Sequence, residues 1–225
     1  MRHFFKIFLI LAIGLVATSC LTFEENYTFN ADGSGEMELI LDISQIASLI
    51  PEGPERDSLF LIGEVFTEME AQMEDLEGIS NLQIIEDRKN SRLGISYDFA
   101  DLDALNGALN AVLVAESVDD NHQFFKQEGN SIVRTNLPAT KGLTLVDGIA
   151  QSLMAEMGGE EEQVNYVLES MNYEMNMDFA SRVKVVYSEA EVEVTDEERQ
   201  QVELKTNFNS IMKDRDALSA SFVLK

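Results

Sequence analysis

Hydrophobic and polar residues alternate along much of the chain, and this period of two predicts β-strands. In segment 36–43, for example, Met37, Leu39 and Leu41 share one face, and Glu38 lies on the other. Turn residues separate paired runs, so three hairpins are expected, at 23–29 with 36–43, 82–88 with 92–99, and 122–128 with 131–137. Further strands are expected at 171–179, 182–187, 192–195, 201–208 and 218–224.

Apolar residues at helical spacing interrupt these hairpins. Segment 58–76 has an apolar stripe opposite a row of glutamates, and segment 101–114 begins at Asp101, a good N-cap residue. Further helices are expected at 146–157 and 161–170. Hairpin pairing implies antiparallel order, and strands with one polar face need a cover on the other face. The expected fold class is therefore α+β: an antiparallel sheet of hairpins with helices packed on one face.

The first twenty residues have the layout of a secretory signal. Arg2 and Lys6 accompany an apolar run at 7–17, which is too short for a stable membrane span, and small residues then lead into Cys20. Cys20 is the only cysteine, so an exported chain would carry a thiol without a disulfide partner. Lipidation of Cys20 uses up this thiol. The alternative is an ordinary signal cut near Ser19, which leaves the thiol free.

The run Val-Ala-Thr-Ser-Cys at 16–20 resembles the bacterial lipoprotein signal, or lipobox, and its Thr-Ser-Cys ending resembles lipoproteins of the Bacteroidetes. It departs from the usual pattern at Ala17, where Leu or Val is typical. The resemblance implies a diacylglycerol thioether and palmitate-type acyl chains on Cys20, which anchor the protein in a membrane. Because Leu21 and not Asp follows the cysteine, the outer membrane is expected, with the leaflet left open.

This signal divides the chain into a signal peptide at 1–19, a lipidated N-terminus with a short tether at 20–26, and a single α+β envelope domain at 27–225. Glu24 and Glu25 fall in the tether. There they resemble the acidic tracts that send some lipoproteins to the cell surface, and the alternative is two solvated acids. The mature protein is expected to be exported and lipid-anchored.

The charge of the chain excludes some partners. There are 16 basic and 41 acidic residues, giving a net charge of −25, and removal of the signal takes away Arg2 and Lys6 but no acid. Such a surface is repelled by nucleic-acid phosphates and by anionic lipid headgroups. No nucleic-acid partner is expected, and membrane attachment is expected to come from the acyl chains.

Motifs for catalysis or metal binding are scarce. His122 is the only histidine outside the signal, so a catalytic triad would have to use it, and a zinc site of several histidines or cysteines is excluded. Segment 30–36 opens like an EF-hand loop, but its twelfth position is Leu41, which favours a hairpin turn. No catalytic, cofactor or metal site is expected. The Asp-Ser-Leu run at 57–59 resembles a short O-glycosylation site at Ser58, and the alternative is a helix N-cap.

Both ends of the mature chain resemble envelope lipoproteins with an LppM-like domain. The segments that carry the resemblance are the strand, Asp-Gly-Ser-Gly turn and strand at 29–44, and the C-terminal strands at 173–179, 183–187, 202–208 and 218–224. The middle of the chain, from 101 to 170, departs from the pattern. The resemblance implies an α+β envelope domain that binds lipid or glycolipid, and it supplies no catalytic residues.

The expected function is that of a membrane-anchored, non-enzymatic envelope lipoprotein that binds a lipid or other hydrophobic ligand, or an envelope protein partner. Two alternatives stay open: a carboxylate-based envelope hydrolase, for which no pair among the 41 acids stands out, and a structural subunit of an envelope assembly. A ligand cavity is expected between helix 58–76 and the apolar sheet face, where the alternative is a filled core. The residues expected to face such a ligand are Leu39, Leu41, Ile95, Tyr97, Met175 and Met177.

Overall fold

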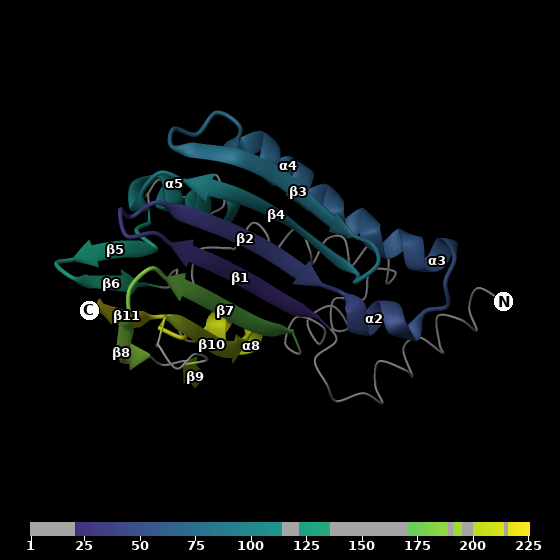
Figure 1. The fold of residues 1–225 in the computed structure, drawn as a ribbon. Coiled ribbons are helices and arrows are strands. Elements are labelled where there is room, and N and C mark those ends of the chain that lie inside the picture. Colours follow the sequence, from purple (N-terminus) through teal and green to yellow (C-terminus); the bar gives the residue numbers. More distant parts are fainter. Residues whose placement is uncertain (1–20, 114–121, 136–170, 189–190, 195–199, 214–215) are drawn as a thin grey trace.

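The structure is a computed structural model that describes residues 21–113, 122–135, 171–188, 191–194, 200–213 and 216–225. The α+β class expected from the sequence is confirmed, since two sheets of mostly antiparallel strands pack with a few helices (Figure 1). The helices expected at 146–157 and 161–170 lie outside the described residues. Within the described part of the chain, no helix has the length and apolar character needed to cross a membrane.

The larger sheet has seven strands in the order β3-β4-β2-β1-β7-β10-β9. They are β1 (Thr22–Phe29), β2 (Gly35–Asp42), β3 (Ile79–Asp87), β4 (Arg92–Phe99), β7 (Asn172–Phe179), β9 (Glu191–Val194) and β10 (Gln201–Asn207). The first two expected hairpins are confirmed, because β1 pairs with β2 and β3 with β4 in antiparallel register. β1 begins at Thr22, so residues 22–26 belong to the sheet and not to a tether, which corrects the expected start of the domain at residue 27.

One strand pair departs from the antiparallel expectation. β1 and β7 are parallel, with Phe23 opposite Tyr173 and Phe29 opposite Phe179. Parallel neighbours cannot be joined by a tight turn, and here most of the domain lies between the two strands in sequence. A hairpin can be predicted only for strands that follow each other in sequence, so the sequence pattern could not predict that β1 pairs with β7. The pair joins the N-terminal and C-terminal parts of the sheet.

The smaller sheet has the order β5-β6-β11-β8. Its strands are β5 (Phe125–Glu128), β6 (Ser131–Arg134), β8 (Val183–Ser188) and β11 (Ala220–Leu224). The third expected hairpin is present as β5 and β6, but it is shorter than expected and belongs to this second sheet. Aromatic rings join the two sheets: the ring centroids of Tyr27 and Phe125 are 4.9 Å apart, and those of Phe179 and Phe222 are 5.5 Å apart.

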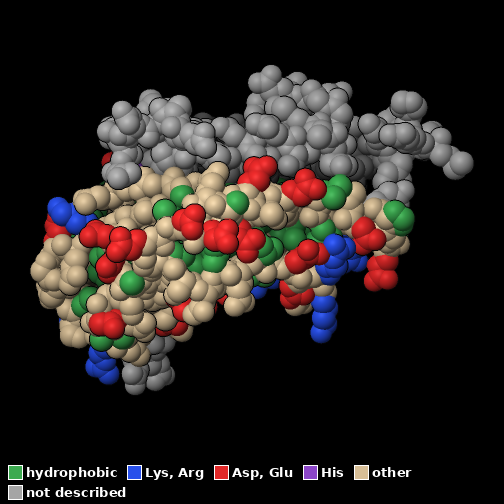
Figure 2. Space-filling view, turned by 90° about the horizontal axis from the view of Figure 1, so that it is seen from above, with side chains coloured by type: hydrophobic (Ala, Val, Ile, Leu, Met, Phe, Trp, Pro, Cys, Tyr) green, Lys and Arg blue, Asp and Glu red, His purple; other side chains and the backbone are tan. Residues whose placement is uncertain are grey.

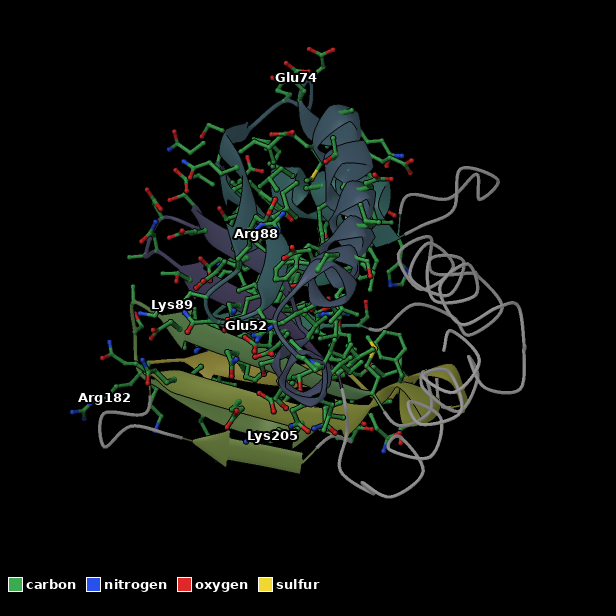
Figure 3. All side chains as sticks on the ribbon, turned by 90° about the vertical axis from the view of Figure 1, so that its right-hand side faces the viewer. Glu52, Glu74, Arg88, Lys89, Arg182 and Lys205 are labelled. Carbon is green, nitrogen blue, oxygen red and sulfur yellow. The ribbon has the colours of Figure 1, made fainter. Side chains whose placement is uncertain are left out.

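Helices cover another part of the larger sheet. They are α2 (Ser44–Leu49), α3 (Pro54–Asp57), the 3₁₀ helix η1 (Ser58–Gly63), α4 (Glu64–Met73), α5 (Leu102–Leu113) and α8 (Phe208–Lys213). The helix expected at 58–76 is thus divided into η1 and α4. The cap expected for α5 is confirmed, because Ala104 N donates to Asp101 Oδ1 at 2.9 Å. α4 and α5 pack against β3 and β4, and Figure 3 shows the helices on one side of the sheet, with the opposite face open among the described residues.

Gly94 lies in β4 between two neighbouring strands and has no room for a side chain. A Cβ at this position would lie 2.2 Å from the carbonyl oxygen of Leu39 and 3.1 Å from Cα of Ile40. Both are backbone atoms of the sheet, so we expect Gly94→Ala to lower the free energy of unfolding by about 1–3 kcal/mol, as overpacking does.

Gly107→Ala is the matched control for this substitution. Gly107 lies within α5, where an added Cβ has no atom within 4 Å. Replacing a helical glycine by alanine should raise the free energy of unfolding by about 0.5–1 kcal/mol. Urea unfolding measures both changes, and a shift of the same sign in both variants would contradict the close strand approach at Gly94.

Candidate functional site

An ionisable side chain lies in the middle of the apolar face of the larger sheet. Side chains alternate along β1, so Phe23, Glu25 and Tyr27 point into the core and Glu24 points to the open face. Glu25 is 0% exposed, whereas Glu24 forms an ion pair with Arg92 on the open face. The expectation of an acidic pair in a solvated tether is therefore wrong for Glu25.

The sheet register places Glu25 among residues that the sequence assigns to a ligand surface. Leu39 on β2 and Met175 on β7 are both directly opposite Glu25. Ile95 on β4 is in turn opposite Leu39. These four side chains form one row across the buried face, with the carboxylate between apolar neighbours.

The remaining three ligand-facing candidates lie in the adjacent rows. Tyr97 and Met177 share a row with Tyr27, and Leu41 is opposite Phe23. All six candidates are exposed by 2% or less and belong to the hydrophobic core. The sequence therefore predicts which face these residues share, and among the described residues the structure places all six in the hydrophobic core.

Three side chains interact with the Glu25 carboxylate. Tyr27 Oη donates a hydrogen bond to Oε2 at 2.8 Å, and Tyr173 Oη donates one to Oε1. Arg134 Nη2 approaches Oε2 at 3.5 Å and completes a buried ion pair. A carboxylate without such partners would be costly to remove from water, so the three donors explain how Glu25 is tolerated in the core.

Arg134 comes from β6, so the ion pair joins the two sheets. Its side chain is 1% exposed, and its Nη1 donates to the carbonyl oxygen of Thr135. The guanidinium lies over the rings of Phe124 and Phe125, at 5.2 and 5.4 Å from their centroids. A planar, weakly hydrated guanidinium suits such aromatic surroundings. Among the described residues, Arg134 Nε and the hydroxyl of Tyr97 have no hydrogen-bond partner.

Burial controls the protonation of this cluster. Burial first, and the Glu25 carboxylate second, raise the pKa of Tyr27 and Tyr173 well above the ordinary tyrosine value. The same two causes raise the pKa of Tyr97. For Arg134, burial lowers the pKa, but Glu25 and the nearby tyrosines outweigh it and the net shift is upward. At neutral pH the phenols therefore stay protonated donors, and the guanidinium stays charged.

The arrangement is suited to holding the sheets together and poorly suited to proton transfer. A general base needs access to the proton that it takes, and Glu25 is enclosed with both carboxylate oxygens bonded. His122 Nε2 lies 3.4 Å from the hydroxyl of Thr135. Asp32 accepts bonds from the backbone N–H and hydroxyl of Ser34, as the expected hairpin turn requires. The described residues contain no group of three His, Cys, Asp or Glu side chains that could hold a metal ion.

The open face of the larger sheet has a shallow groove of about 280 Å³. Its lining includes Asn26, Thr28, Asn176, Asp178, Gln201 and Glu203. Asn176 Nδ2 donates to Asn26 Oδ1 at 2.8 Å, and Gln201 Nε2 donates to Asp178 Oδ2 at 3.0 Å. These amide, hydroxyl and carboxylate groups make the groove polar.

The two modification sites expected from the sequence stay predictions. Cys20 lies outside the described residues. Ser58 begins η1 and is half-buried, and Asp57 makes no side-chain cap bond there, so the N-cap alternative finds no support.

The ion pair was not predicted from the sequence, although the alternation of buried and exposed residues places both Glu25 and Arg134 at core positions. Glu25 shares the parity of Phe23 and Tyr27, and Arg134 shares that of Ile132. Opposite charges at core positions of two strands indicate a buried pair, because neither charge is tolerated there alone. Assigning Glu25 to a tether removes it from this pattern.

The ion pair predicts coupled energetics. Glu25→Gln and Arg134→Met each leave the partner's charge buried, so we expect each to lower the free energy of unfolding by about 3–5 kcal/mol. The double variant removes both charges and should cost clearly less than the sum of the single changes. Urea unfolding of the four proteins at pH 7 gives the coupling energy.

Lys126→Met is the control for loss of an ion pair at the surface. Lys126 Nζ lies 2.8 Å from Glu128 Oε1, and both side chains are more than half exposed. Its removal should cost about 1 kcal/mol or less. Additive costs for Glu25 and Arg134 would show that the two charges do not depend on each other.

Comparison with known proteins gives a weak similarity to solved structures. No protein-family model matches the chain, and no curated protein matches it. Among solved structures, the chain is similar to the NMR structure of the folded domain of LppM from Mycobacterium tuberculosis, with 10% identity, a TM-score of 0.40 and 92% of each chain covered. At this identity and TM-score, no residue role and no function passes from that protein to this one.

Proposed function

We propose that this protein is a non-enzymatic lipoprotein of the bacterial envelope, held in the membrane by acyl chains on Cys20. The signal-like segment before Cys20 supports the proposal, and so does the place where the fold begins. Leu21 is 2% exposed, and its carbonyl oxygen accepts a hydrogen bond from Asn172 N at 3.0 Å. Leu21, the residue next to the one that would carry the lipid, is therefore already part of the folded domain.

This direct junction is the observation that carries the proposal. Cleavage on the amino side of Cys20 leaves every described strand intact. Cleavage beyond Leu21 would remove this buried residue or part of β1 from the core. Processing at Cys20 is thus compatible with the sheet. The outer membrane stays part of the proposal, because Leu21 follows the cysteine.

For the folded domain we propose a binding role. The six residues expected to face a hydrophobic ligand are exposed by 2% or less, which gives no support to an open cavity at that face. The groove on the open face is accessible, and its amide, hydroxyl and carboxylate groups suit the polar surface of an envelope protein partner. An enclosed Glu25 also leaves the hydrolase alternative without support from this cluster.

Intact mass spectrometry of detergent-extracted protein tests the anchor. We expect the mass of residues 20–225 plus a diacylglyceryl group and an amide-linked acyl chain, with the protein in the membrane fraction. Cys20→Ser should lose the lipid mass, while Ser19→Ala, which keeps a small residue before the cysteine, should retain it. A bare chain with a free thiol would contradict the proposal.

Site-specific photo-crosslinking in intact cells tests the partner. A photoreactive residue in place of Asn176, on the open face, should form a discrete adduct, and Asn26→Arg should abolish that adduct by filling the groove. The same residue in place of Lys126, which is exposed on β5 of the smaller sheet, is the control and should form none. An adduct at position 126 alone, or equal adducts at both positions, would exclude the groove as the contact surface.

A further inference from the structure

The position of the anchor limits how the domain can sit on a membrane. Cys20 is bonded directly to Leu21, which is buried and hydrogen-bonded to β7. Consecutive Cα atoms are about 3.8 Å apart, so an acylated Cys20 keeps the start of β1 within one residue of the lipid headgroups. No linker therefore separates the domain from the bilayer.

The sheet register shows what else lies at this end of the domain. Thr22 is opposite Asp42 at the end of β2, and Asp42 is opposite Arg92 at the start of β4. Helix α2, which follows β2, and the turn at 88–91 therefore lie at the same end of the sheet as the anchor (Figure 1). Figure 3 looks onto this end, where Lys89 is labelled.

A large apolar side chain is exposed at this end. Leu49, in the last turn of α2, is 42% exposed. Ala47 and Ile50 beside it are buried, so α2 is fixed to the domain while Leu49 is held outward. A single exposed leucine does not by itself indicate an interaction surface. Here, however, the anchor brings a bilayer within reach, and burial of this side chain at the interface is favourable.

Charge opposes contact along a whole face of the domain. The net charge of −25 disfavours a flat arrangement on anionic headgroups. The anchor end carries charges of both signs, because Arg88 pairs with Asp57 at 3.7 Å and with Glu86, while Lys89 and Glu52 are exposed. Figure 2 shows acidic side chains spread along the surface and basic side chains at both ends, with charges of both signs at the right-hand end, which is the anchor end.

We propose that the domain stands end-on at the membrane, with Leu49 seated in the interfacial layer and the β1–β2 turn at the far end. This inference rests on the lipid anchor proposed above. The occupant of the surface is the bilayer that holds Cys20, because the direct bond between Cys20 and Leu21 leaves no room for another partner between the domain and the membrane. β1 has eight residues, so Ala31 in the far turn lies about 25 Å from the anchor end.

The absence of tryptophan from the chain allows a direct test, because one introduced tryptophan reports only its own surroundings. Leu49→Trp places the reporter at the proposed contact, and Ala31→Trp places it at the exposed far turn as the matched control. The acylated proteins are reconstituted into phosphatidylcholine vesicles with and without brominated acyl chains. Bromine quenches tryptophan only at short range. We expect Leu49→Trp to lose emission on brominated vesicles and to shift to the blue, and Ala31→Trp to show neither change.

Vesicle flotation separates failure of the anchor from failure of the orientation. Protein that does not float overturns the proposed function and this inference with it. Protein that floats but shows equal quenching in both variants, or none in either, keeps the anchor and overturns the end-on arrangement alone. Circular dichroism checks the fold of each variant, and Ser48→Trp, at the neighbouring exposed position, replaces Leu49→Trp if that variant does not fold.

Discussion

A carboxylate buried between two sheets is tolerated only where the fold also supplies its counter-charge. Glu25 of β1 and Arg134 of β6 satisfy each other only when the larger and smaller sheets are packed together. Tyr27 and Tyr173 then complete the hydrogen bonds of the carboxylate. A shift of β1 by one residue would turn Glu25 to the open face and leave Arg134 alone in the core. The ion pair therefore favours one register and one packing of the sheets over the alternatives.

The same cluster lies in the middle of the buried apolar face. Two phenols, a guanidinium and the rings of Phe124 and Phe125 converge on Glu25 and its neighbours. Methionine often lines adaptable surfaces, but Met175 and Met177 are fully buried beside this polar cluster. A hydrophobic ligand entering here would have to displace a buried ion pair. The binding surface that we propose is for this reason the outer face of the sheet.

β1 joins the proposed anchor, the core and the groove. Its first residues follow the expected lipid attachment site, its buried face carries Glu25, and its open face contributes Asn26 to the groove. In the end-on arrangement the strands run away from the bilayer. The open face then looks sideways, along the membrane, where a neighbouring envelope protein can reach it.

Local sequence patterns determined the elements whose physical cause is local. Alternation located the β1–β2 and β3–β4 hairpins, and Asp101 marked the start of α5, because turns and caps involve residues close in sequence. The parallel β1–β7 pair and the second sheet depend on contacts between distant segments, which no local pattern encodes. Alternation also assigns a residue to a face without showing what covers that face. The charge of Glu25 led to the prediction that it lies in solvent. Only tertiary packing brings it to Arg134, 109 residues away.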